Sequence, residues 1–142
     1  MRVAVGADDT GPLTATIVAD LHERACEVEL YGALADGSAA WASIGRAVGE
    51  AVAAGRADIG IVCCWTGTGI SIAANKVPGV RAALCADAVT AQGARRWNDA
   101  NVLALSMRAT SPAVGLEILA AFLATGVTGD DAERAEIAAL EG

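Results

Sequence analysis

Apolar residues in this chain recur with two spacings that alternate from one end to the other. Short alternating or continuous apolar runs are typical of strands, and they occur at residues 1–6, 26–31, 57–63, 81–85 and 102–106. Apolar residues three or four apart predict helices at residues 13–24, 41–54, 70–76, 88–96, 111–124 and 130–140. The small residues at 32–40 are expected to form a loop.

Strict alternation of strands and helices is typical of an α/β fold in which helices cover both faces of a parallel sheet. No repeat, low-complexity tract or long linker divides the 142 residues, so we expect one domain over residues 1–142. Ligands of such folds bind beyond the carboxyl ends of the strands, near a switch in strand order. The walls of a site are therefore expected at residues 6–11, 63–69, 85–88 and 106–108.

Composition narrows the function classes. The chain is 54% hydrophobic but only 4% aromatic, which favours close packing through small residues, and no uncharged apolar stretch is long enough to span a membrane. A formal charge of −7 argues against nucleic-acid binding, which needs a basic surface. The N-terminus resembles a first strand instead of an export signal, so we expect a cytoplasmic protein.

The cysteines and the histidine do not form a metal-binding pattern. Cys-x-x-Cys spacing is absent, and the single histidine, His22, cannot complete a zinc site with the four cysteines. We therefore expect no metal and reduced thiols. Cys63 and Cys64 are neighbours in a predicted strand, so their side chains should point to opposite faces of the sheet.

The run from residue 60 to 75 carries the strongest chemical signal. It places Cys64 where a buried strand ends, before a turn of Thr66, Gly67, Thr68 and Gly69 and a helix of small residues. The N-terminus of a helix attracts negative charge and favours a thiolate over a thiol. The run therefore predicts a nucleophile or base beside an anion cradle, although a buried cysteine can also be a plain packing residue.

Two acidic residues, Asp8 and Asp9, follow the first strand. Aspartate is common at turns and helix N-termini, where its carboxylate accepts hydrogen bonds from free backbone N–H groups. One of the pair is expected to do this, and the other to face the ligand crevice. The Gly-x-Gly pattern at 67–69 lacks the lysine and serine of a nucleotide P-loop, which argues against nucleotide binding there.

Three segments together resemble the family of type B ribose-5-phosphate isomerases and galactose-6-phosphate isomerase subunits. They are Thr66-Gly67-Thr68-Gly69-Ile70-Ser71-Ile72-Ala73-Ala74, residues 75–85 and the stretch from Asn98 to Leu105. The resemblance extends over residues 1–140 and is densest at 60–105. It implies a Rossmann-like three-layer α/β/α sandwich with a five-stranded parallel sheet. It also implies an aldose–ketose isomerase without metal or organic cofactor, assembled as a homodimer or a dimer of dimers with shared active sites.

The resemblance also implies roles for individual residues. Cys64 would be the base that moves a proton through an enediolate, and Thr66 the hydroxyl that helps set its protonation. The backbone cradle for the enediolate would comprise Gly67, Thr68, Gly69, Ile70 and Ser71. Other positions that match substrate-contacting residues of the family are Asp8, Asp9, Asn98, Arg108 and Arg134.

Two tryptophans depart from the pattern of the family. Trp65 replaces a glycine next to Cys64, and Trp97 replaces the histidine that opens the sugar ring. Each ring either packs plainly or alters the pocket. Without that histidine, cyclic pentoses and hexoses should be poor substrates, whereas a tetrose or tetrulose phosphate needs less help.

Further departures lie outside the run. Residues 40–42 stand where the family has Asp-Tyr-Pro. Near the C-terminus the family has an Arg-His pair, with a second arginine a turn later, for phosphate; Asp130-Asp131 replaces the pair, and only Arg134 remains of that set. We therefore predict an isomerase of a small sugar phosphate, possible substrates being a tetrose or pentose. A substrate without phosphate is a second reading, and a non-catalytic sugar-binding or partner subunit is the alternative of another class.

Overall fold

The computed structural model describes residues 1–35 and 37–142. Its five strands are β1 (Arg2–Ala7), β2 (Glu27–Gly32), β3 (Ile59–Cys64), β4 (Ala82–Leu84) and β5 (Val102–Ser106). The helices are α1 (Pro12–Glu23), α2 (Trp41–Ala53), α3 (Thr68–Asn75), α4 (Ala88–Asn98), α5 (Pro112–Ala124) and α6 (Asp131–Leu140). Asp36, inside the loop predicted over 32–40, lies outside the described residues.

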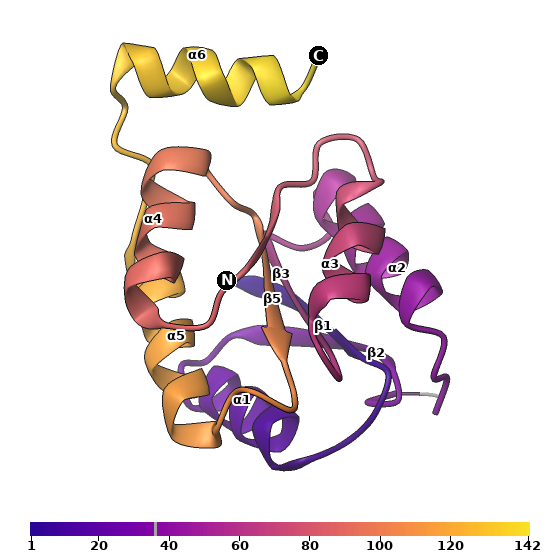
Figure 1. Ribbon diagram of the computed structural model, residues 1–142. Helices are drawn as coiled ribbons and strands as arrows, with labels where there is room; N and C mark the ends of the chain where they lie inside the picture. Colours follow the sequence, from indigo (N-terminus) through magenta and orange to yellow (C-terminus); the bar gives the residue numbers. More distant parts are fainter. Residues whose placement is uncertain (36) are drawn as a thin grey trace.

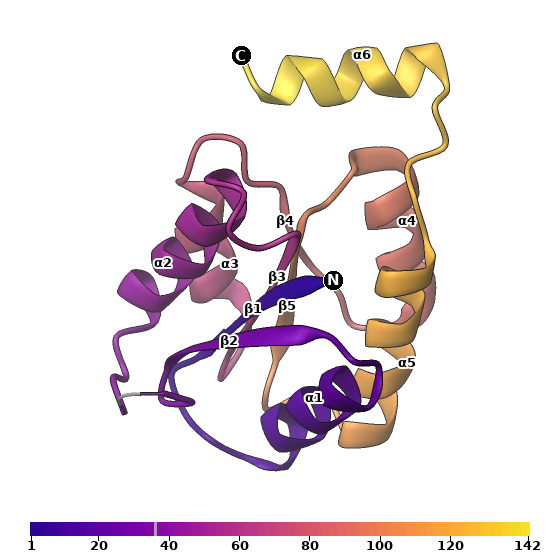
Figure 2. The same ribbon diagram turned by 180° about the vertical axis from the view of Figure 1, so that it is seen from behind.

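The strands form one parallel sheet in the order β2-β1-β3-β5-β4 (Figures 1 and 2). Strand β1 has its sequence neighbour β2 on one side and β3 on the other, so the order of the strands switches between β1 and β3. The connection after β1 leads to α1 on one face, and the connection after β3 leads to α3 on the other face. A crevice between the two connections is therefore expected at the carboxyl ends of β1 and β3.

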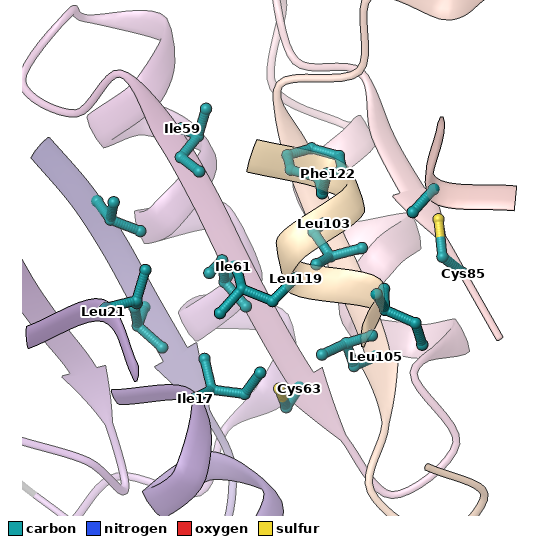
Figure 3. Packing of buried hydrophobic residues seen from close by; sticks show 14 of the residues in the cluster. Ile17, Leu21, Ile59, Ile61, Cys63, Cys85, Leu103, Leu105, Leu119 and Phe122 are labelled. Carbon is teal, nitrogen blue, oxygen red and sulfur yellow. The ribbon is translucent and has the colours of Figure 1, made fainter. Parts of the chain in front are cut away.

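Helices cover both faces of the sheet, as the alternating pattern predicts. One core joins the sheet to α1, α4 and α5 through Ile17, Leu119 and Phe122, among others (Figure 3). The other core joins the opposite face to α2 and α3 through Val48 and Ile70. The fold class predicted from the sequence, an α/β/α sandwich with five parallel strands, is thereby confirmed.

Every predicted element is present, and its ends differ from the prediction by at most two residues. Two of these differences bear on the site. Strand β3 extends one residue further than predicted and ends on Cys64, and α4 continues past Arg96 to include Trp97 and Asn98. Among the described residues, no helix is long and apolar enough to cross a membrane.

Helix α6 differs from the other helices because none of its residues is buried. It lies across the end of the sheet opposite the tip of the β5 arrow (Figure 1). Asp130 begins it by accepting hydrogen bonds from the backbone N–H groups of Ala132 and Glu133. Its position in the molecule therefore depends mainly on polar contacts.

Candidate functional site

Cys63 and Cys64 lie at the end of β3, at the switch in strand order, and face opposite cores. Cys63 belongs to the core under α1 and α5, whereas Cys64 belongs to the core under α2 and α3, as their adjacency in a strand predicts. Burial, with a smaller contribution from the charges of Cys64 and Asp8, raises the pKa of the Cys63 thiol to about 12. Cys63 is therefore a packing residue that stays protonated.

The Cys64 thiol lies against the start of α3. Its Sγ accepts a hydrogen bond from the backbone N–H of Gly67 at 3.2 Å, and its side chain is 5% exposed. Sulfur that accepts an N–H at the positive end of a helix is stabilised as an anion. This is the environment predicted for a base at the tip of the strand.

Only glycine fits position 67. Its φ of 76° lies in the left-handed region, and a Cβ there would approach the Leu105 carbonyl carbon to 2.8 Å. The close approach of this turn to β5 allows the Gly67 N–H to reach back to the thiol. The glycine that the motif predicted for an anion cradle is thus required by the backbone.

The first turn of α3 presents backbone N–H groups beside Cys64. The N–H of Ser71 makes the first intrahelical bond, to the Gly67 carbonyl at 3.3 Å, so those of Thr68, Gly69 and Ile70 have no acceptor within α3. The indole of Trp41 lies over this turn, 3.1 Å from where a Cβ of Gly69 would be. Trp41, the first residue of α2, forms a wall of the cradle. The sequence did not single it out as a site residue, although it lies in residues 40–42, where the family has Asp-Tyr-Pro.

The hydroxyl of Thr66 has a different partner from the one predicted. It pairs with the Thr68 hydroxyl at 2.8 Å, and not with the Cys64 thiol, because the turn directs both threonine side chains outward. Both residues are exposed. Thr66 therefore adds a polar group to the rim of the cradle, and the Gly67 N–H is the group that contacts the thiol.

The aspartates at the end of β1 divide as predicted. Asp9 is exposed and its carboxylate accepts the N–H of Thr10 at 2.8 Å, which is a local turn contact. Asp8 is half-buried one residue beyond Ala7, which pairs with Cys63 across the sheet. Burial, and to a smaller extent the charge of Asp9, raises the pKa of Asp8. Asp8 is thus the less exposed member of the pair, and its place at the ligand crevice stays a prediction.

The segment after β5 closes another side of the site. The N–H of Met107 donates to the Cys64 carbonyl at 2.9 Å. The Trp65 carbonyl accepts two hydrogen bonds, from the N–H of Arg108 at 3.0 Å and from the Ser106 hydroxyl. A cleft of about 290 Å³ beside this segment is lined by residues that include Thr66, Ser106 and Arg108. Arg108 is exposed there and can meet an anion. The ring of Trp65 is 66% exposed, so in the single chain it fills no cavity.

Trp97, Asn98 and Arg134 do not join this site within one chain. Helix α4 starts at the carboxyl end of the sheet and runs back, so its last residues, Trp97 and Asn98, lie at the amino end, with α6 and Arg134 (Figure 1). The sheet, about 15–20 Å long, separates them from Cys64. Within one chain, the direction of α4 thus carries Trp97 to the other end of the sheet from Cys64, and its effect on the pocket stays a prediction.

Two clefts lie beside α4. Trp97 is 53% exposed and lines a cleft of about 490 Å³ that runs along α4 from Val89 near its start and borders Leu84 at the end of β4. Asn98 lines this cleft and a second one, of about 480 Å³, that reaches α6. His22 is exposed on α1. Within the described residues, no group of three or more histidine, cysteine or acidic side chains is arranged to hold a metal ion.

Comparison with known proteins agrees with the resemblance seen in the motifs. Residues 3–140 match the family described as Ribose/Galactose Isomerase. Ribose-5-phosphate isomerase B of Escherichia coli is 43% identical over 118 residues, which cover 82% of this chain and 76% of that protein. D-erythrulose-4-phosphate isomerase of Pectobacterium atrosepticum is 36% identical over 125 residues, covering 87% and 82% of the two chains.

The fold is shared with solved structures as well. The structure of ribose-5-phosphate isomerase B from Clostridium thermocellum matches with a TM-score of 0.93 at 37% identity, covering 99% of this chain and 95% of that one. The agreement thus includes the sequence over residues 3–140 and the fold over nearly the whole chain. The chain belongs to the ribose/galactose isomerase family.

Proposed function

We propose that this protein is an aldose–ketose isomerase that acts on a small sugar phosphate and uses Cys64 as its base. The observation that carries the proposal is the hydrogen bond from the Gly67 N–H to Cys64 Sγ at the start of α3. A thiolate at this point can take a proton from a carbon next to a carbonyl, and the same turn offers N–H groups to the oxygen that becomes negative.

The proposed reaction moves protons only. The Cys64 thiolate removes the proton from the hydroxyl-bearing carbon beside the carbonyl, and the C–H electron pair forms the double bond of an enediolate. The negative oxygen is stabilised by the free N–H groups of Thr68, Gly69 and Ile70. The Cys64 thiol then returns the proton to the neighbouring carbon, while one hydroxyl proton passes between the two oxygens. No electron leaves the substrate.

The proposed enzyme is a homodimer, or a dimer of dimers, in which each site takes residues from two copies. Asn98 and Arg134 lie at the opposite end of the sheet from Cys64, so they can contact its substrate only from a second copy. Large exposed apolar side chains support such pairing, since groups of them at a surface often mark a protein–protein interface. They are Trp41, Trp65, Ile72, Leu84, Val89 and Trp97.

The substrate that we propose is a short-chain sugar phosphate such as D-erythrulose 4-phosphate. The only histidine of the chain, His22, is exposed on α1, and Trp97 occupies the position of the ring-opening histidine. A four-carbon sugar phosphate cannot close a six-membered ring and needs no such group. The relative named D-erythrulose-4-phosphate isomerase, 36% identical, supports this choice.

Incubation in heavy water tests the activity. We expect the full-length protein to incorporate deuterium at the carbon beside the carbonyl of D-erythrulose 4-phosphate, and less well with D-ribose 5-phosphate. Cys64→Ser should lower the exchange rate by at least about 10³-fold, because a hydroxyl is a far weaker base than a thiolate. Cys63→Ala, next in sequence but on the other face, is the matched control and should keep most of the activity.

The result also decides between this proposal and its alternative. Asp130 caps α6 in the structure, so its presence does not by itself argue for a non-catalytic subunit. If no sugar shows exchange, with or without phosphate, the isomerase proposal is wrong and a sugar-binding or partner subunit takes its place. Exchange only with sugars that lack phosphate would reject the phosphate part alone.

A further inference from the structure

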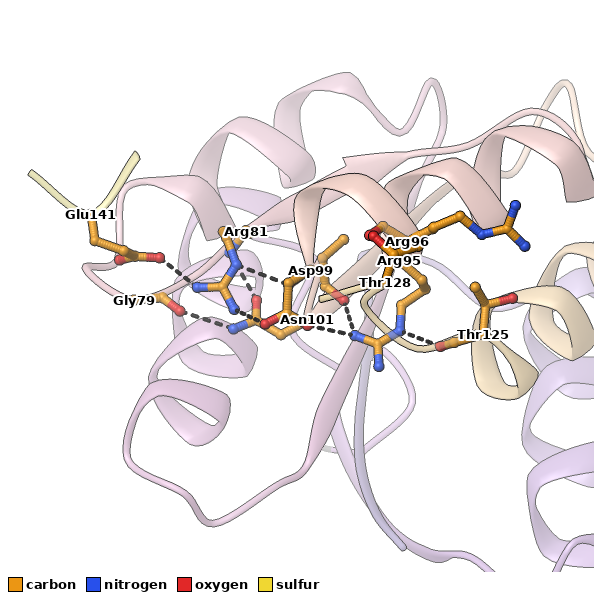
Figure 4. A network of polar contacts seen from close by, with 10 residues as sticks. Gly79, Arg81, Arg95, Arg96, Asp99, Asn101, Thr125, Thr128 and Glu141 are labelled. Carbon is orange, nitrogen blue, oxygen red and sulfur yellow. Dashed lines mark hydrogen bonds and ion pairs between the residues drawn. The ribbon is translucent and has the colours of Figure 1, made fainter. Parts of the chain in front are cut away.

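One guanidinium at the amino end of the sheet, that of Arg81, links α4 to α6 (Figure 4). Its Nε donates to the Asp99 carbonyl at 2.8 Å and its Nη2 to the Asp99 carboxylate at 3.3 Å, while Nη1 binds the carboxylate of Glu141. We infer that Arg81 is a positioning residue that sets Asn98 and Arg134 for the site of a second copy. The inference rests on the proposed shared site.

The network has two arms, the contacts of Arg81 with Asp99 and its contact with Glu141. The first arm fixes the end of α4. Asp99 has φ 45° and ψ 46°, a left-handed conformation that costs a non-glycine residue energy and needs support from its surroundings. Arg81 holds both its carbonyl and its carboxylate. Asn98 is exposed in the last turn of α4, where helices fray most readily, so its direction depends on this support.

A second guanidinium, that of Arg95, also contacts the turn after α4. Arg95 donates to the carbonyls of Ala100 at 2.5 Å and Thr125 at 3.1 Å, and its Nη1 lies 3.5 Å from the Asp99 carboxylate. Its guanidinium carbon is 5.3 Å from the centre of the Phe122 ring. Asp99 is therefore held between two arginines, one on each side of the turn that follows Asn98.

The second arm fixes α6. This helix buries no residue, and its anchors are at its two ends. Before it, the N–H of Thr128 donates to the Arg96 carbonyl at 3.2 Å, and after it, Glu141 binds Arg81. Arg134 lies between these anchors. The loss of the Arg81 contact would leave α6 held at one end only.

Both arms border a common cleft. Arg81, Asn98, Leu140 and Glu141 line the cleft of about 480 Å³ between α4, β4 and α6. Arg81 is partly buried, with its side chain 18% exposed, and uses three of its nitrogens on separate acceptors. A lysine could not reproduce this, because it offers one point charge instead of a planar fork.

The test compares Arg81→Met and Arg81→Lys with Arg2→Met in the full chain. Arg2 is the matched control because it forms an ion pair with Asp58 at the same end of the sheet, away from Asn98. Asn98 and Arg134 would contact parts of the substrate that do not react, so their displacement should weaken ground-state and transition-state binding alike. We expect Arg81→Met to raise KM for D-erythrulose 4-phosphate about 10- to 100-fold with kcat little changed.

Several controls separate positioning from general damage. A merely structural loss reduces the amount of active enzyme and hence the apparent kcat, but leaves KM unchanged. Arg81→Lys should lie between wild type and Arg81→Met, and Arg2→Met should match wild type. In an Asn98→Ala, Arg134→Ala background, Arg81→Met should cause no further rise in KM, because the groups that it positions are gone.

The outcomes distinguish this inference from the proposed function. If the wild type turns over substrate but Arg81→Met keeps its KM, or if its effect persists in the double-mutant background, the role of Arg81 is wrong and the isomerase proposal stands. If the wild type is inactive with every sugar phosphate, both are wrong. Should Arg81→Met fail to fold, Asp99→Ala and Glu141→Gln cut the two arms separately, and each is expected to raise KM less.

Discussion

The two ends of the sheet differ in how their polar groups are satisfied. All five ion pairs among the described residues lie at the amino end or in the last turn of α1 beside it. The carboxyl end instead holds a thiol, two exposed threonine hydroxyls and backbone N–H groups without acceptors in α3. One end is locked by its own contacts, and the other is left open for a ligand.

This difference agrees with a trade-off between stability and function. Groups that must meet a substrate cannot be satisfied by the protein itself, so a ligand site is less stable than a surface optimised for folding. In the proposed dimer, the locked end of one copy would present Asn98 and Arg134 to the open end of the other. A rigid presenting surface would reduce the entropy lost on binding.

The largest expected effect comes from mixing two variants that are each impaired when the substrate is far below the KM of Asn98→Ala. Cys64→Ser removes the base at the open end, and Asn98→Ala removes a contact at the locked end. If each site combines both ends from different copies, a heterodimer has one intact site, so random exchange of subunits should restore about one quarter of wild-type activity. The rate of the mixture after subunit exchange measures this.

The two variants assayed singly and mixed without time for exchange serve as controls. A third control mixes Cys64→Ser with Asp58→Asn, which alters an exposed ion pair at the locked end. At equal amounts, this mixture should show only the activity of the sites whose Cys64 comes from an Asp58→Asn chain. No recovery in the Cys64→Ser and Asn98→Ala mixture, with both variants folded and dimeric, would show that the two ends do not meet in one site.

A smaller but still large effect is expected at Gly67. Gly67→Ala must place a Cβ against the Leu105 carbonyl at a positive φ, so we expect a loss of about 2–4 kcal/mol in the free energy of unfolding. The N–H of residue 67 would also leave the thiol, and kcat should fall. Denaturant unfolding and steady-state kinetics measure the two losses.

The matched control is Gly79→Ala. Gly79 also has a positive φ, of 84°, but nothing lies within 4 Å of an added Cβ, and it is near the locked end. Its variant should lose only the conformational part, about 1 kcal/mol, and keep kcat. Equal losses in the two variants would mean that the contact with β5 is unimportant.

The smallest expected effect concerns thiol reactivity. Burial raises the pKa of Cys63 to about 12 and, with a contribution from Asp87, that of Cys85 to about 11. Because only the thiolate reacts and its fraction falls about tenfold for each pH unit below the pKa, both should react slowly with iodoacetamide at pH 8, and Cys85 should approach its full rate only as the pH nears 11. Cys64 is expected to be labelled faster than Cys63, because it lies beside the turn that begins α3 whereas Cys63 is fully buried.

Peptide mass spectrometry after timed labelling measures the three rates. Cys26, half-buried before β2, serves as a reference for the labelling rate of a more accessible thiol. Labelling of Cys63 as fast as Cys64 at pH 8 would contradict the assignment of the two cysteines to a packing role and a chemical role.

Local patterns in the sequence predicted most of the fold and the position of Cys64 at the end of a strand. The elements, the parallel sheet and the opposite faces of Cys63 and Cys64 all follow from apolar spacing. The turn before α3 was also predicted, because a glycine turn between a buried strand and a helix has few conformations, whereas the use of its N–H groups as an anion cradle stays a prediction. The hydroxyl of Thr66 was assigned the wrong partner, since side-chain rotamers within a turn have no periodic signature.

The residues that motif matching grouped with Cys64 needed the tertiary structure. The motifs did not say at which end of the sheet Asn98 and Trp97 lie; a helix that follows a strand returns to the start of the sheet, and α4 continues two residues further than predicted. The network around Asp99 could not be predicted either, because Arg81, Arg95 and Glu141 come from separate segments.

The sequence by itself determined the layers of this protein and the thiol at the tip of β3, because these depend on spacing between near neighbours. Only the tertiary structure decided that Asn98 and Arg134 lie at the far end from Cys64, and that Arg81 links Asp99, after α4, to Glu141, after α6. Contacts between distant segments depend on helix directions and packing, which local spacing does not encode. The same chain thus carries an open end and a locked end, and their separation points to a second copy.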